Sequence, residues 1–93
     1  MEKGRIAVER VQTGVRMEKR LLQVLRALAD LKGITLGDLL EGIVLHSFEG
    51  RAPFGPETLA QIEDLRRVFG LGLDAGASHR LRETSEATEG DGR

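Results

Sequence analysis

The sequence predicts a mainly α-helical fold with one short strand, in which two copies of the chain pair through that strand. Apolar and polar residues alternate with a period of two over residues 11–17, and three longer stretches after them have apolar residues at helical spacing. No second strand is evident in the sequence. A chain of 93 residues buries little surface alone and gains stability by dimerising.

The predicted strand covers residues 11–17. Its apolar and β-branched residues alternate with Gln12, Gly14 and Arg16, which is typical of a strand with one apolar and one polar face. Gly14 is unfavourable inside a strand, so the prediction rests on the other residues. A lone strand leaves its backbone N–H and C=O groups unpaired. We therefore expect the same segment of a second copy to pair with it as an antiparallel two-stranded β-ribbon.

Two helices are predicted after the strand, so that residues 11–50 form one unit. The first helix spans residues 18–31, and Gly33 suits the left-handed conformation in which helices often end. Thr35 is a typical N-cap residue for the second helix, which runs to about Phe48. Residues 1–10, before the strand, are expected to form a flexible arm.

A linker and a third helix are predicted over residues 51–73. Pro56 suits the first position of this helix, whose apolar stripe ends near Phe69 and Gly70. Residues 74–93 contain one large apolar residue, too few to offset the entropy lost on ordering. A disordered tail is therefore expected.

Positive charge is concentrated at the N-terminal end, although the net charge of the chain is −1. Residues 1–32 carry eight Lys or Arg against four acids, residues 33–50 carry three acids and no Lys or Arg, and residues 51–93 carry six Arg against eight acids. A nucleic-acid binder needs a local basic face rather than a positive total. The N-terminal third is the candidate for such a face.

The order of the elements resembles the ribbon-helix-helix family of DNA-binding proteins, of the Arc and CopG type. The likeness covers about residues 10–50, through the segments QTGVRM, EKRLLQVLRALADLKG and ITLGDLLEGIVLHSFEG. It implies an intertwined homodimer whose ribbon lies in the major groove of double-stranded DNA, and a second helix whose N-terminal amides hold a phosphate. Carried over by position, the base-contacting residues would be Gln12, Gly14 and Arg16, and the phosphate-contacting backbone would be that of Thr35, Leu36 and Gly37.

The chemistry of these residues agrees with the implied roles. Arg pairs with guanine and Gln with adenine, each discriminating between bases by about 1–3 kcal/mol, and helix N-terminal amides bind phosphate without a cationic side chain. Arg10, Lys19 and Arg20 could add phosphate contacts, although Lys19 and Arg20 are also typical solvated surface residues. Gly14 has no side chain to read a base, so either base contacts are few or the glycine permits a close approach of the backbone.

A helix-turn-helix protein is the structural alternative, since a short glycine-containing turn separates the first two helices. Its second helix would have to enter the major groove, yet residues 36–48 carry Asp38 and Glu41 and no Lys or Arg. The charge therefore disfavours this alternative.

Other classes of protein have little support in the sequence. The chain has no Cys, and His46 and His79 have no partners at metal-ligand spacing, so no metal or cofactor is expected. No phosphate loop or nucleophile motif is present, and we expect no enzymatic activity. The start of the chain does not resemble a signal peptide, no apolar run could cross a bilayer, and a cytoplasmic location is expected.

The sequence thus predicts a dimeric, sequence-specific DNA-binding protein that acts as a transcriptional regulator or nucleoid-associated protein, with several dimers side by side on DNA as one arrangement. A second hypothesis is an antitoxin or adaptor whose residues 56–93 bind a protein partner. A third is that the cationic residues bind a small anionic ligand in competition with DNA, but no feature of the sequence selects it.

Overall fold

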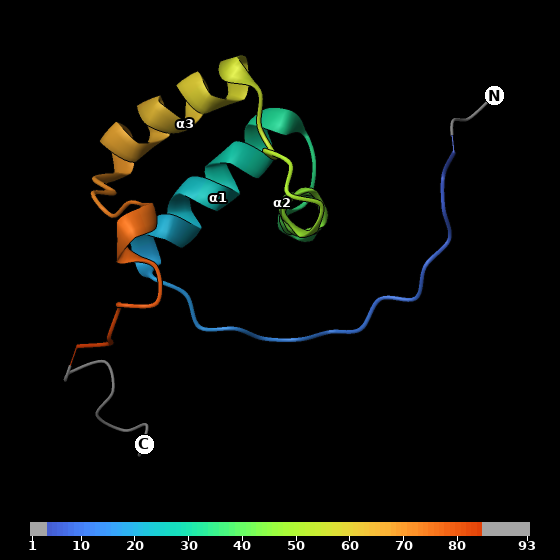
Figure 1. The fold of residues 1–93 in the computed structure, drawn as a ribbon, viewed down its shortest axis with the longest axis horizontal. Coiled ribbons are helices and arrows are strands. Elements are labelled where there is room, and N and C mark those ends of the chain that lie inside the picture. Colours follow the sequence, from blue (N-terminus) through green and yellow to red (C-terminus); the bar gives the residue numbers. More distant parts are fainter. Residues whose placement is uncertain (1–3, 85–93) are drawn as a thin grey trace.

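Three α-helices and one 3₁₀ turn make up the computed structural model, which describes residues 4–84 (Figure 1). The elements are α1 (Lys19–Lys32), α2 (Leu36–Phe48), α3 (Pro56–Phe69) and the 3₁₀ turn η1 (Ala75–Ala77). The three helices confirm the three helical stretches expected from the spacing of apolar residues. None of the helices between residues 4 and 84 is both long and apolar enough to cross a membrane.

The predicted strand is wrong in this structure, and with it the ribbon-helix-helix fold and its intermolecular two-stranded β-ribbon. Residues 11–17 are extended but make no ladder of backbone hydrogen bonds, and the described part of the chain contains no strand or sheet. The physical reason is that a β-strand needs a paired neighbour, whereas alternating side chains favour only the extended backbone. Within residues 4–84, no segment forms backbone hydrogen bonds with residues 11–17 to supply this pairing.

Glycines end α1 and α3, as their positions after the apolar stripes predict. Gly33 and Gly70 adopt left-handed conformations with φ of 69° and 70°. The N–H of Ile34 then donates to the carbonyl of Ala29 at 3.0 Å, and that of Leu71 to the carbonyl of Arg66 at 2.9 Å. Such bonds satisfy carbonyl groups left open at a helix C-terminus and turn the chain back toward the body of the molecule.

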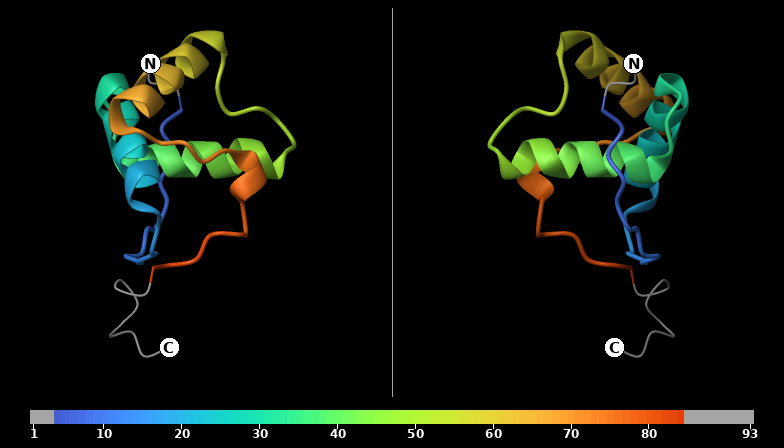
Figure 2. Two further views of the ribbon diagram at one scale, coloured as in Figure 1. Left: turned by 90° about the vertical axis from the view of Figure 1, so that its left-hand side faces the viewer. Right: turned by 90° about the vertical axis from the view of Figure 1, so that its right-hand side faces the viewer.

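The helices pack with α1 at the centre. α3 runs back alongside α1 in the opposite direction, and α2 crosses them at a steep angle (Figures 1 and 2). The core is centred on Leu28, which is 1% exposed, together with Ala29 and Leu39. Half-buried Ile62 and Leu65 of α3 pack against this cluster. The third helix is therefore an integral part of the folded body, and it brings its C-terminal end next to the N-terminal end of α1.

The segments at both ends of the described chain lie outside the helices. The expected N-terminal arm is extended and exposed over residues 4–10, while Met1–Lys3 lie outside the described residues. The disordered tail was expected from Asp74 onward, but the structure places a 3₁₀ turn at Ala75–Ala77, where the Asp74 carboxylate accepts a hydrogen bond from the N–H of Gly76 at 3.0 Å. Residues 85–93 of the expected tail lie outside the described residues.

Candidate nucleic-acid interface

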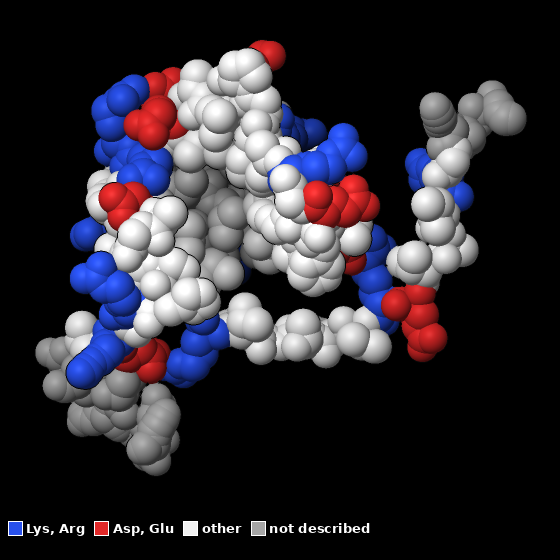
Figure 3. All heavy atoms as spheres, viewed as in Figure 1, with Lys and Arg blue, Asp and Glu red and all other residues white. Residues whose placement is uncertain are grey.

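The predicted base-contacting residues lie in an exposed, extended segment that leads into α1. We call residues 10–16 the reader segment. All seven are exposed, with Val11 and Val15 at 79% and 74%. Figure 3 shows uncharged atoms along the middle of this segment, and its only charged residues, Arg10 and Arg16, are its two ends. Gln12 and Arg16 thus lie on an accessible edge of the molecule.

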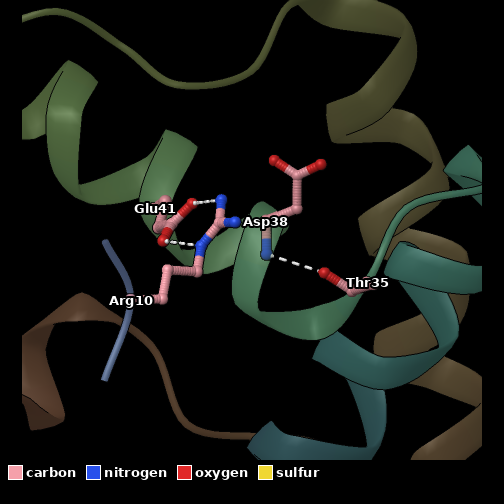
Figure 4. Close-up of polar contacts among 4 residues, drawn as sticks. All are labelled: Arg10, Thr35, Asp38 and Glu41. Carbon is pink, nitrogen blue, oxygen red and sulfur yellow. Dashed lines mark hydrogen bonds and ion pairs between the residues drawn. The ribbon is translucent and has the colours of Figure 1, made fainter. Parts of the chain in front are cut away.

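Arg10 anchors the first end of the reader segment to α2. Its Nε donates to Oε2 of Glu41 at 2.9 Å and its Nη2 to Oε1 at 2.8 Å (Figure 4). The two hydrogen bonds, followed by the charge attraction, lower the pKa of Glu41. The same hydrogen bonds and charge raise the pKa of Arg10, with a smaller contribution from Asp38. Arg10 was predicted to contact phosphate, but in this structure its guanidinium faces a carboxylate.

Arg16 anchors the other end of the reader segment to the C-terminal part of the chain. Its Nε donates to Oε2 of Glu83 at 2.9 Å, and its Nη2 donates to the same oxygen. Glu83 and Glu41 are the two acids that sequence reasoning did not connect with the reader segment. No local signal could have identified them, since they lie 67 and 31 residues from their partners.

Gly14 lies in open space between these two anchored ends. A Cβ atom placed on it would meet no atom within 4 Å, and its φ lies outside the left-handed range. Neither crowding within the chain nor backbone conformation requires glycine here. If glycine is required at this position, the reason must lie in a molecule outside this chain. A close approach of the backbone to DNA, as suggested by the sequence, would be such a reason.

The predicted phosphate-contacting backbone lies at the N-terminus of α2. Thr35 is the N-cap, and its Oγ1 accepts a hydrogen bond from the N–H of Asp38 at 3.0 Å (Figure 4). Leu36 is half-buried and Gly37 is exposed. The first amides of a helix have no partner within the helix, so those of Leu36 and Gly37 are the ones suited to an anion.

An open hollow of about 720 Å³ joins this helix terminus to the reader segment. Arg10, Thr13, Thr35 and Gly37 all line it, so the structure brings four residues from two predicted regions together. Its other lining residues are Glu9, Val11, Asp38, Leu40 and Glu41. Three acids therefore surround the single arginine, and a phosphate in this hollow would have to displace Glu41 from Arg10 or approach the helix amides from outside.

Lys19 and Arg20 are exposed on the first turn of α1, which begins three residues after the end of the reader segment. Glu18 is the N-cap of this helix, and its Oε1 accepts a hydrogen bond from the N–H of Leu21 at 2.7 Å. The carboxylate is thus turned toward the helix backbone, where it satisfies an otherwise open amide. Lys19 and Arg20, both predicted to contact phosphate, are thus exposed three and four residues after Arg16.

Among the described residues, no group of three or more His, Asp or Glu side chains is arranged so that it could hold a metal ion. The third helix, expected as the protein-binding end in the adaptor hypothesis, uses Ile62 and Leu65 against α1. A protein partner would have to bind the outer face of α3 or the residues after this helix.

No protein-family model, curated protein or solved structure matches this chain.

Proposed function

We propose that this chain is a homodimeric, sequence-specific double-stranded DNA-binding protein that acts as a transcriptional regulator or nucleoid-associated protein. The observation that carries the proposal is the exposed, extended reader segment, with Gln12 and Arg16 accessible and with Lys19 and Arg20 exposed shortly after it. An extended chain is narrow enough to enter the major groove, where Gln and Arg distinguish bases by paired hydrogen bonds.

Two exposed cationic residues after the reader segment, Lys19 and Arg20, are suited to bind the phosphates of the DNA backbone. Contacts from Lys19 and Arg20 would position the reader segment without reading sequence. Each phosphate neutralised releases counterions, so binding is expected to weaken with salt by about 0.9 log units per contact for each tenfold rise in salt concentration. Base contacts by Arg16 would then account for the sequence specificity.

Exposed apolar residues support the homodimer. Val44, Leu45 and Phe48 are neighbours on one side of α2 and are 43%, 64% and 81% exposed. Apolar residues of the arm, Ile6 and Val8, line an open groove of about 580 Å³ with this side of α2. Contiguous apolar surface of this kind commonly marks an interface, and the dimer would carry two reader segments related by a two-fold axis.

Selection of bound duplexes from sheared genomic DNA, followed by fluorescence anisotropy on the enriched sequence, tests the proposal. Arg16→Lys should retain charge but lose the paired contact to guanine, so the preference for the selected duplex over a scrambled one should fall about 5- to 150-fold for each Arg16 of the dimer. Arg51→Lys, at an exposed arginine in the linker between α2 and α3, is the matched control and should behave as wild type. Equal preference in Arg16→Lys and wild type would reject base reading by Arg16.

A further inference from the structure

Arg16 and Glu83 form an ion pair between opposite ends of the described chain. Two nitrogens of the Arg16 guanidinium donate to one carboxylate oxygen of Glu83. Both side chains remain accessible, at 67% and 38% of their full exposure. Glu83 therefore engages the Nε and Nη2 groups of Arg16, while the Arg16 side chain stays exposed to solvent.

The fold after α3 guides the chain to this contact. Leu71 is buried directly after the glycine that ends α3, and Arg66 donates from Nη2 to the carbonyl of Leu73 at 3.0 Å. After η1, Nη1 of Arg80 donates to the carbonyl of Gly76 at 3.0 Å. After η1 the chain continues to Glu83, which contacts Arg16 three residues before the start of α1. The antiparallel packing of α3 on α1 thus places the residues after α3 close enough to the reader segment for Glu83 to contact Arg16.

The chemistry of this contact puts it in competition with DNA binding. A guanine offers two acceptors to an Arg side chain, which pairs with them through two adjacent nitrogens of the guanidinium. The Nε and Nη2 groups that would form one such pair are engaged by Glu83. A phosphate oxygen near Arg16 would also meet the negative charge of Glu83. DNA and Glu83 therefore compete for the Nε and Nη2 groups of Arg16.

From this geometry we propose that Glu83 is an intramolecular competitor of DNA. It occupies Arg16 in the free protein and leaves when DNA binds, so that segment 71–84 is an autoinhibitory element; this inference rests on the proposed DNA-binding function. Because the carboxylate is tethered on the same chain, its local concentration at Arg16 is high and independent of protein concentration.

The size of the effect follows from the exposure of the pair. Solvent-exposed ion pairs are worth little, and their removal should tighten DNA binding by about two- to fivefold. Salt screens such pairs, so the difference between variant and wild type should shrink at high ionic strength. An effect of this size would tune the occupancy of DNA sites rather than switch binding on or off.

Glu83→Gln tests the proposal, with Glu63→Gln as the matched control. Glu63 is an exposed acid on α3, and both substitutions raise the net charge by one. Anisotropy with the selected duplex should give tighter binding for Glu83→Gln than for Glu63→Gln. The advantage should disappear when each substitution is combined with Arg16→Ala, because the competed side chain is then absent.

Two outcomes of the binding assay separate the two proposals. Equal affinities of the Glu83→Gln and Glu63→Gln variants, with DNA still bound, overturn the competitor role of Glu83 and leave the proposed function intact. A chain that binds no duplex at low salt in wild type or either variant overturns both. In the free protein, a shift of the Arg16 Nε–H NMR signal in Glu83→Gln, absent in Glu63→Gln, supports the contact independently of DNA; an unchanged signal counts against it.

Discussion

Arg10 and Glu41 join the N-terminal segment to α2 through two parallel hydrogen bonds of 2.9 and 2.8 Å (Figure 4). This paired geometry is the most directional way in which an arginine contacts a carboxylate. Side-chain exposures of 65% and 47% show that water has access to both partners. The pair therefore orders the start of the reader segment and adds little to the stability of the helices.

Acidification should release this anchor. Folding lowers the pKa of Glu41, so the stabilisation is present above the ordinary pKa of a glutamate and is lost as the pH falls through the lowered value. We expect backbone ¹⁵N relaxation of residues 6–10 to show increased motion on this acid side, with the helices unchanged. Glu41→Gln should show the increased motion already at neutral pH. Motion that does not depend on pH in wild type would contradict the role of the pair.

Gly14→Ala should leave folding unaffected and weaken DNA binding. The site has open space and no positive φ, so the free energy of unfolding should change by less than about 0.5 kcal/mol. Lower affinity for the selected duplex would indicate a close approach of the backbone to DNA. Gly33→Ala is the contrast, because its φ of 69° should cost roughly 1–2 kcal/mol in chemical denaturation. Wild-type DNA affinity in Gly14→Ala would favour the alternative of few base contacts.

Leu28→Ala should destabilise the chain strongly. Leu28 is 1% exposed at the centre of a small core, and removing a buried leucine side chain costs about 2–5 kcal/mol. Urea denaturation followed by circular dichroism measures this loss. Leu31→Ala, on the same helix at 58% exposure, should change stability by less than about 0.5 kcal/mol. Similar losses in both variants would contradict the packing of α1 described above.

Leu45→Glu should prevent dimerisation. Leu45 is 64% exposed on the apolar side of α2, and a carboxylate buried in an apolar interface without a partner is strongly unfavourable. Sedimentation velocity should show a dimer for wild type and a monomer with unchanged helical content for the variant. Val68→Glu, at an apolar residue of α3 that is 73% exposed, should remain dimeric. A monomeric wild type, or dissociation by both variants alike, would argue against an interface on α2.

The candidate site could be predicted only in part from the sequence. Thr35 is the N-cap that its position before an apolar stripe indicates, and Gln12 and Arg16 are exposed in an extended segment. The ion partners Glu41 and Glu83 could not be predicted, because nothing near them in the sequence marks them as neighbours of Arg10 and Arg16.

The sequence by itself determined the helices and where they end. Apolar spacing, Thr35 as a cap and glycines such as Gly33 act within a few residues, so their effect does not depend on the rest of the fold. The tertiary structure alone decided that α3 packs antiparallel on α1 and that Glu83 reaches Arg16. It also decided that residues 11–17 stay extended without becoming a strand. A contact between distant residues needs a partner side chain, and a strand needs a partner backbone. Only the packed molecule specifies where such partners lie.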